Sequence, residues 1–220
     1  QKETILDNLR FESTNGLILG KEKIGDNLED MALPKLGYSL TRSIMLKLKE
    51  QSKATFKEKI NESYGKPLQF RKTGRYWLNA LEKMPYISTK IETIKLETES
   101  ERDFSIILIN SSLFYLYWAT YGNSRDFTLG LLRKFPFPPK EILSKESRKI
   151  SSLKNSLTMC LTNSFTKKGS QGEFKTSNCK QTIDNIDDFL STIYGLNSEE
   201  TTFIKQYDST LRHNTQNPYP

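Results

Sequence analysis

Residues 103–138 read DFSIILINSSLFYLYWATYGNSRDFTLGLLRKFPFP, and this stretch decides which fold the chain can adopt. From its acidic first residue it runs for about five helical turns almost without charge. Large apolar side chains would cover nearly every face of that helix: Phe104, Ile107, Leu108, Phe114, Tyr115, Trp118 and Tyr121. Because a helix that is apolar all round lies at the centre of a domain, we predict one buried helix over residues 103–121. Ser111 and Ser112 would let another element approach it closely.

A polar loop follows the predicted helix. The chain breaks at Gly122 and continues as Asn123, Ser124, Arg125 and Asp126. Arg133 and Lys134 come shortly afterwards, before the proline-fixed segment 135–138, whose two Phe rings can pack on the core. A rigid buried helix that ends in such a loop presents basic side chains at a fixed place on the surface.

Net charge and its distribution point to a polyanionic partner. The 220 residues contain 33 Lys and Arg against 26 Asp and Glu, which gives a net charge of +7 and an isoelectric point near 9.2. Residues 35–95 hold 14 basic and 5 acidic side chains, a net +9, whereas residues 1–30 and 181–220 carry net charges of −3 and −4. This segregation is typical of a DNA-facing middle flanked by segments that face solvent or other protein.

The most informative basic segment lies in chain that reads as extended. Leu68 and Phe70 alternate with polar residues, which predicts a strand, and Gly74 marks a turn. Candidate DNA-contacting residues gather around this turn: Arg71, Lys72, Thr73, Arg75, Tyr76 and Trp77. Guanidinium and ammonium groups bind guanine edges or phosphates, and flat rings pack against sugars or bases. In the alternative interpretation, the two aromatic rings belong to the core and the cations merely surround it.

Two neighbouring segments extend the basic region. Ser88 and Lys90, which precede a strand predicted at residues 91–96, are further candidate DNA contacts. Upstream, Ser39 or Thr41 can cap a helix. Its apolar face would consist of Leu40, Ile44 and Leu48. The lysines on its other faces either contact phosphates or are simply solvated.

The chain beyond the basic region reads as mostly helical. An acidic patch at residues 97–103 closes that region, and a helix is predicted over residues 140–165. Residues 167–178 are rich in Gly, Ser and Thr, which predicts a mobile loop. Two amphipathic helices finish the chain. The first is ended by Gly195, and the second begins at a capping box of Asn197 and Glu200. The apolar face of the second would be Phe203, Ile204, Tyr207 and Leu211.

No catalytic or metal-binding motif is recognisable. There is no P-loop, nucleophile elbow or HExxH sequence, and Cys160 and Cys179 have no metal-ligand spacing with His213. Three carboxylates at helical spacing favour a solvated helix face over a magnesium site: Asp184, Asp187 and Asp188. Without a long apolar run or a signal peptide, the protein is expected to be soluble and intracellular, with both cysteines as reduced thiols.

Four segments, in the same order, resemble the TaqI-like target recognition domains at the C-terminal end of adenine-specific DNA methyltransferases and of fused restriction–modification enzymes. They are FRKTGRYWLNALEKMPY at residues 70–86, ISTKIETI at 87–94, ILINSSLFYLYWATYGNSRDF at 107–127 with KFPFP at 134–138, and IDNIDDFLSTIYGLNSEETTFIKQYD at 183–208. Together the similar segments span most of the chain from about Leu33 to Arg212. The chain departs from the family pattern after the loop, where Phe127, Thr128 and Gly130 replace an Asn or His and an acidic residue.

The resemblance implies an α+β fold with a small mixed sheet and a central buried helix. Residues 34–139 would form the target recognition core, and residues 140–215 would form C-terminal helices packed on that core or on a neighbouring domain. Residues 1–33 would be a linker or the end of a preceding domain. Since the sequence starts at Gln1 without an initiator Met, we expect a piece of a longer protein.

The resemblance also implies a function: sequence-specific recognition of double-stranded DNA in a bacterial, cytoplasmic restriction–modification enzyme. Side chains from residues 71–77 and 123–127 would reach base edges while other cations neutralise phosphates. The methyltransferase domain with its S-adenosylmethionine, and in fused enzymes a nuclease domain with magnesium, would lie elsewhere in the parent chain. No cofactor and no membrane are expected here. The alternatives are a helical module that docks another subunit of the complex, and a nuclease with an unrecognised site.

Overall fold

The computed structural model describes residues 38–213 except residues 52, 53, 62, 75, 124, 169 and 170. The linker predicted at residues 1–33 and the candidate residues Arg75 and Ser124 lie outside the described residues. The helices are α2 (Ser39–Glu50), α3 (Glu99–Ile109), α4 (Ser112–Tyr121), α5 (Leu129–Arg133), α6 (Lys140–Lys145), α7 (Ser147–Asn163), α8 (Lys180–Ile193), α9 (Ser198–Gln206) and α10 (Ser209–His213), with 3-10 helices η2 (Phe56–Lys59) and η3 (Thr176–Cys179). The strands are β1 (Ala54–Thr55), β2 (Ile60–Asn61), β3 (Lys66–Arg71), β4 (Ala80–Leu81), β5 (Ile91–Leu96), β6 (Pro136–Phe137), β7 (Phe165–Lys168) and β8 (Gln171–Phe174).

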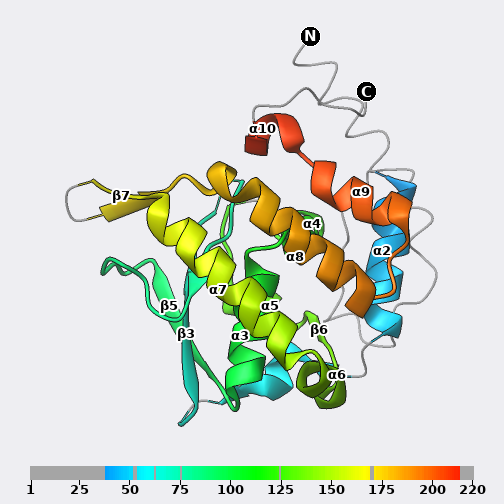
Figure 1. Ribbon diagram of the computed structural model, residues 1–220, viewed down its shortest axis with the longest axis horizontal. Coiled ribbons are helices and arrows are strands. Elements are labelled where there is room, and N and C mark those ends of the chain that lie inside the picture. Colours follow the sequence, from blue (N-terminus) through cyan, green and yellow to red (C-terminus); the bar gives the residue numbers. More distant parts are fainter. Residues whose placement is uncertain are drawn as a thin grey trace.

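The strands form one small sheet and two short ribbons. The sheet has the order β2-β5-β3-β4, while β1 pairs with β6 and β7 pairs with β8, all antiparallel. Figure 1 shows β3, β5 and β7 on one side of the molecule and α2 and α9 on the other. The predicted α+β class, with a small sheet and buried helical segments, is confirmed.

The alternating pattern in the basic segment does form a strand. In β3, Leu68 and Phe70 are fully buried while the residues between them are not, because successive side chains point to opposite faces. The strand predicted at residues 91–96 is β5, which pairs with β3 from Lys66 opposite Leu96 to Arg71 opposite Ile91. The sheet therefore places the end of β3 beside the start of β5.

The buried helical stretch is two helices rather than the single predicted one. It begins earlier, where Thr98 and Glu101 form a capping box at the start of α3. It breaks at Ser111, whose hydroxyl donates to the Leu108 carbonyl at 2.6 Å and accepts from the Phe114 amide at 3.0 Å. The Ser111 side chain thus caps α4, which is the physical reason for the break.

The break admits a carboxylate from α8. Asp187 is fully buried, and its Oδ1 accepts hydrogen bonds from the amides of Ser112 and Leu113 at 2.9 and 3.2 Å. The close approach predicted at Ser111 and Ser112 is therefore confirmed. The solvated face predicted for Asp184, Asp187 and Asp188 is wrong for Asp187, because the free amides at the start of α4 attract an anion into the core.

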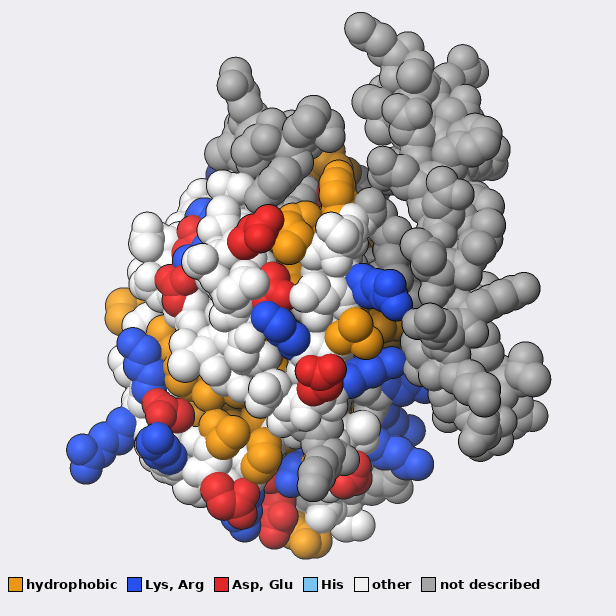
Figure 2. Space-filling model, turned by 90° about the vertical axis from the view of Figure 1, so that its right-hand side faces the viewer, with side chains coloured by type: hydrophobic (Ala, Val, Ile, Leu, Met, Phe, Trp, Pro, Cys, Tyr) orange, Lys and Arg blue, Asp and Glu red, His pale blue; other side chains and the backbone are white. Residues whose placement is uncertain are grey.

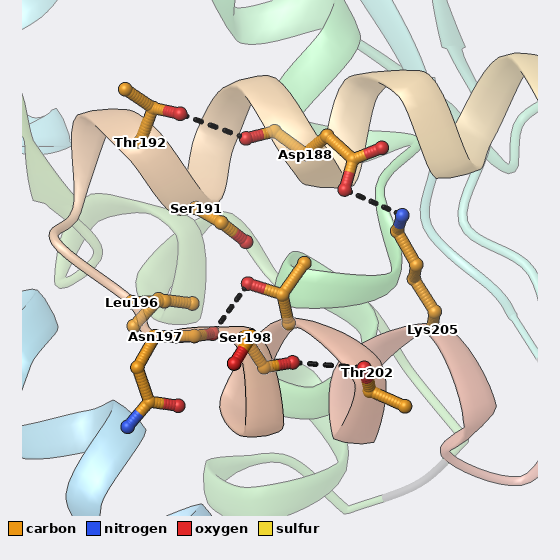
Figure 3. Close-up of a pocket in the computed structure, with 9 residues that line it drawn as sticks. Asp188, Ser191, Thr192, Leu196, Asn197, Ser198, Thr202 and Lys205 are labelled. Carbon is orange, nitrogen blue, oxygen red and sulfur yellow. Dashed lines mark hydrogen bonds and ion pairs between the residues drawn. The ribbon is translucent and has the colours of Figure 1, made fainter.

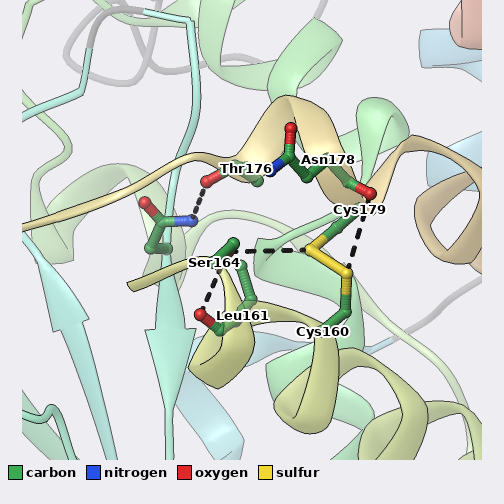
Figure 4. The surroundings of a disulfide bond; sticks show 7 residues. Cys160, Leu161, Ser164, Thr176, Asn178 and Cys179 are labelled. Atoms are coloured by element: carbon green, nitrogen blue, oxygen red, sulfur yellow. Dashed lines mark hydrogen bonds between the residues drawn. A yellow bond between two sulfur atoms is a disulfide. The ribbon is translucent and has the colours of Figure 1, made fainter. Parts of the chain in front are cut away.

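The predicted helix over residues 140–165 is also divided, into α6 and α7. The loop predicted at residues 167–178 instead contains the β7–β8 hairpin and η3, since the rings of Phe165 and Phe174 pair across the two strands at 5.1 Å. The expectation of free thiols is wrong. Cys160 and Cys179 form a disulfide that ties the end of α7 to η3, with a Cα–Cα distance of 5.8 Å (Figure 4).

Smaller corrections concern the ends of helices. The chain leaves α8 through Gly195 at φ +65°, and the capping box of Asn197 and Glu200 starts α9, both as predicted. The helix then ends before Asp208, at φ 52°, so that Leu211 on α10 is 55% exposed instead of lining the core. At the other end of the chain, α2 starts after Tyr38 without the side-chain cap expected from Ser39 or Thr41.

Candidate nucleic-acid interface

Three of the predicted DNA-contacting segments meet at one place. The amide of Phe127 donates to the Lys72 carbonyl at 2.7 Å, and the amide of Gly74 donates to the Arg125 carbonyl at 3.2 Å, so that residues 72–74 and 125–127 pair as a short antiparallel ladder. The amide of Lys72 donates to the Lys90 carbonyl at 2.7 Å. We call residues 71–74, 88–90, 123 and 125–127 the loop cluster.

The buried helix α4 fixes the loop that follows it. Trp118 is 1% exposed, and its indole Nε1 donates to the Asp126 carbonyl at 3.0 Å. Gly122, which follows α4, packs directly against Trp118. A Cβ at this position would lie 2.6 Å from the Trp118 carbonyl oxygen and 3.2 Å from its ring. Phe127, where the sequence departs from the family pattern, is fully buried against Phe70 at a ring distance of 4.6 Å. The core therefore holds the loop on both sides.

Polar side chains shape the loop from within. The Asn123 carbonyl oxygen Oδ1 accepts from the amides of Arg125 and Asp126 at 2.9 and 2.7 Å, and its Nδ2 donates to Asp126 Oδ2 at 3.2 Å. This is the local turn that Asn favours. Nearby, Arg71 Nε donates to Thr73 Oγ1 at 3.2 Å, and the Ser88 hydroxyl accepts from the Lys90 amide. These candidate residues hold the backbone of the loop cluster in place.

Three cations remain on the surface of the loop cluster. Arg125 and Lys90 are exposed, and neither side chain forms an ion pair with another described residue. The Lys72 side chain is 42% exposed and lies 3.5 Å from Glu92 Oε2, an exposed contact that a phosphate can replace. The cluster thus presents exposed positive side chains on a backbone held by hydrogen bonds.

The two aromatic candidates, Tyr76 and Trp77, differ in exposure and in their contacts. Tyr76 is 38% exposed, but Trp77 is half-buried, and the Arg212 guanidinium lies 4.3 Å from its ring centre. The same guanidinium lies 4.3 Å from the Tyr115 ring, and its Nε donates to the Tyr76 carbonyl at 3.1 Å. Burial lowers the pKa of Arg212, and the carboxylate of Asp187 opposes that shift. Packing, rather than stacking on DNA, is the role that these contacts favour for Trp77.

The acidic patch predicted at residues 97–103 is half internal: Glu97 and Glu99 are exposed, whereas Glu101 and Asp103 are buried. Arg102 is 7% exposed and bonds to Asp103 Oδ1 through Nε and Nη2, at 2.9 and 2.7 Å. Its Nη2 also contacts Glu99 and Glu82, at 2.9 and 3.3 Å. Lys154 on α7 completes the group, 2.7 Å from Glu82 and 3.7 Å from Asp103. We call Glu82, Glu99, Arg102, Asp103 and Lys154 the internal ion cluster, because the paired Arg102 and Asp103 at its centre are buried.

The basic helix α2 lies away from the loop cluster, on the face viewed in Figure 2. Acidic, basic and neutral side chains are interspersed there. Lys47 Nζ lies 2.7 Å from Glu200 Oε2, and Glu200 is 1% exposed. Lys47 has neither of the two roles left open for the lysines of α2, phosphate contact and solvation, because its ion pair with Glu200 joins α2 to α9.

An open pocket of about 410 Å³ lies between α8 and α9 (Figure 3). Three of its hydroxyls donate to backbone carbonyls one turn earlier in the chain: those of Thr192, Thr201 and Thr202. Lys205 pairs with Asp188 at 2.5 Å. The Ser191 hydroxyl, 4% exposed, has no hydrogen-bond partner among the described residues, and a nucleophile needs a base beside it. The pocket therefore holds no catalytic constellation.

Among the described residues, no three His, Cys, Asp or Glu side chains are grouped so that they could hold a metal ion. No helix within these residues has the length and apolar character needed to cross a membrane.

Comparison with known proteins gives no assignment. No protein-family description, no curated protein and no solved structure matches the chain. The functional conclusion therefore depends on the geometry of the loop cluster and on the sequence resemblance.

Proposed function

We propose that the chain is a sequence-specific DNA recognition module, the target recognition domain of a bacterial restriction–modification enzyme that acts on adenine. The observation that carries the proposal is the backbone pairing of residues 72–74 with residues 125–127. Hydrogen bonds join two segments that lie about fifty residues apart in sequence and that were each predicted to contact DNA. Each segment exposes a cation beside these hydrogen bonds, Lys72 in one and Arg125 in the other. Such an arrangement suits a reading head, because binding residues are commonly found on loops positioned by a rigid scaffold.

The side chains of the loop cluster divide the work of recognition. Lys72 and Lys90 neutralise phosphates and set the orientation of the duplex. Arg125, held by a short turn at the end of the buried helix, reaches a base edge with its planar guanidinium. Asn123, Asp126 and Ser88 keep the backbone rigid, so that little conformational entropy is lost when DNA binds.

Catalysis belongs to other parts of the parent protein. S-adenosylmethionine and magnesium would be bound there. The methyltransferase domain and, in a fused enzyme, a nuclease domain are the expected protein partners. The bacterial cytoplasm is the proposed location, since the DNA to be modified is there.

A matched pair of variants tests the proposal. In Lys72→Ala/Arg125→Ala, two cations of the loop cluster are lost; in Lys49→Ala/Arg148→Ala, two exposed cations on α2 and α7 are lost. Fluorescence anisotropy with a mixed-sequence duplex should show salt-dependent binding by the parent chain. The first variant should bind more weakly, with the slope of log K against log salt reduced by about 1, because Lys72 is its one phosphate contact and each lost phosphate contact removes nearly one unit. The second variant should match the parent.

Two results would refute the proposal. One is the absence of salt-dependent DNA binding by the parent chain, and the other is an equal loss of binding in both double variants. If the chain instead forms a stable complex with another protein of a restriction–modification system and ignores DNA, the docking alternative is correct.

A further inference from the structure

Among the described residues, one large apolar side chain is almost fully exposed. Ile87 is 96% exposed, far more than the next two, Tyr64 at 64% and Met159 at 63%. It lies in the turn at residues 84–90, between β4 and β5. A branched aliphatic side chain in that position adds no burial to the fold and is accessible to a bound ligand.

Both flanks of the turn are anchored. On one side, the amide of Met84 donates to Gln69 Oε1 at 2.7 Å, and Met84 itself is 4% exposed. Tyr86 stacks on Phe165 of β7, with ring centres 5.9 Å apart and planes 7° from parallel. Gly172 permits this stack, since a Cβ there would lie 2.1 Å from the Phe165 ring and 3.2 Å from the Tyr86 ring.

The other flank leads directly into the loop cluster. The amide of Ile91 donates to the Ser88 carbonyl at 3.1 Å, and the carbonyl of Lys90 accepts from the Lys72 amide. The turn is thus a short surface loop whose two ends are fixed by hydrogen bonds and packing. Ile87 comes one residue before the loop cluster in the sequence. Figure 1 shows β3, β5 and β7, the strands that brace it, on the same side of the molecule.

The charges around Ile87 are mainly positive. Lys83 and Lys90 are exposed on the two flanks, and Lys167 is exposed on β7. The neighbouring carboxylates are already paired, Glu82 with Lys154 at 2.7 Å and Glu92 with Lys72 at 3.5 Å. An isolated apolar tip among cations fits a polyanion with an apolar interior better than it fits a protein, whose docking site would need a contiguous apolar patch.

We propose that the turn at residues 84–90 enters the minor groove of the bound duplex, with Ile87 inserted as an apolar wedge at a base step. Inserted aliphatic side chains unstack such steps and kink the duplex toward the major groove, and the bent DNA then meets more of the protein surface. Lys83 and Lys90 contact the phosphates on the two sides of the groove. The inference rests on the proposed DNA binding and adds a second mode of contact, which does not depend on charge.

The test compares Ile87→Ala with Met159→Ala, which shortens an exposed apolar side chain on α7. Binding is measured with end-labelled duplexes that contain flexible TA steps, by anisotropy for affinity and by energy transfer between the ends for bending. Ile87→Ala should weaken binding by about tenfold, the effect of losing one buried aliphatic side chain, and should abolish the bend. The salt slope should stay that of the parent chain, because no phosphate contact is lost. Met159→Ala should behave as the parent.

The outcomes separate the two proposals. If the parent chain binds DNA and Ile87→Ala binds and bends it equally well, the wedge is refuted and the proposed function stands. If the parent chain binds no DNA at all, the proposed function itself fails. A loss of binding in Ile87→Ala that is accompanied by a lower salt slope would also refute the wedge, since it would assign an electrostatic effect to this turn.

Discussion

The loop cluster and the internal ion cluster both contain arginine and carboxylate side chains, but use them in opposite ways. Arg102 is 7% exposed and lies within 3.3 Å of three carboxylates, whereas Arg125 is exposed and has no ion pair among the described residues. A buried charge needs partners because its desolvation is costly. An exposed charge on a braced backbone costs the fold little and is available to a ligand. Burial and pairing, rather than residue type, therefore separate the structural cations from the candidate contacts.

Removing Arg102 should have the largest effect on stability. Arg102→Ala leaves Asp103 buried without its closest partner, so the free energy of unfolding should fall by about 3–5 kcal/mol. Urea denaturation measures this, with Arg148→Ala, an exposed site on α7, as the control that should change it by less than about 0.5 kcal/mol. A loss in Arg102→Ala as small as that of the control would show that the internal ion cluster is not a structural feature.

Asp187 should give the stability of the protein an unusual pH dependence. Burial raises its pKa to about 6, above the value of about 3.9 for an unfolded aspartate. The folded state therefore holds the proton more tightly, and the stability that this residue contributes is lost as the pH rises through that interval. Ser112, Leu113, Arg212 and Asp184 act on the carboxylate. Relative to Asp187→Asn, the parent chain should lose about 2 kcal/mol between about pH 4 and pH 7. Denaturation at both pH values measures the difference, and an unchanged difference would contradict the raised pKa.

Replacing Arg212 tests whether a buried cation also holds the segment at Tyr76 and Trp77 in place. Arg212→Ala removes the contact to the rings of Trp77 and Tyr115, which should cost about 2 kcal/mol for a desolvated cation–π pair. It should also shift the fluorescence of Trp77 to the red, because one face of the ring becomes wet. Trp77→Phe provides the control spectrum, in which Trp118 is the remaining tryptophan. If the fluorescence stays unchanged, Arg212 does not cover that ring.

Arg125 should have the smallest effect on stability and a clear effect on binding. Arg125→Ala should change the melting temperature by less than about 2 °C, since the side chain has no partner within the described protein. Its affinity for the recognised duplex should fall by about tenfold, the effect of losing one base contact. A strongly lowered melting temperature with intact affinity would make Arg125 a structural anchor and would end the contrast with Arg102.

Short-range features could be read from the sequence. The alternation in β3, the strand β5 and the capping box of Asn197 and Glu200 were all predictable, because each depends on residues within a few positions. The two DNA-contacting segments were also identifiable as candidates. Their pairing was not, since residue spacing gives no distance between segments about fifty residues apart.

The sequence-based predictions that were wrong share a cause, which is contact between residues far apart in the sequence. The buried helix breaks at Ser111 where Asp187, 75 residues later than Ser112, supplies an acceptor for free amides. Arg212 reaches the Tyr76 carbonyl across 136 residues of sequence. Polar residues that look solvated in a local pattern are drawn into the core when a distant partner satisfies them. Ile87 could have been noticed, since it follows Pro85 and Tyr86 in a segment that leads to a strand, but its exposure follows from the fold alone.

Mapping of amide chemical shifts during titration with duplex DNA tests the central claim most directly, because it reports every surface of the folded chain at once. If the loop cluster is the DNA face, the largest changes should fall on residues 71–74, 87–90 and 125–127, while α2 and α9 should stay unchanged. Changes concentrated on α2 or on the α8–α9 pocket, with residues 71–74 and 125–127 unaffected, would contradict it.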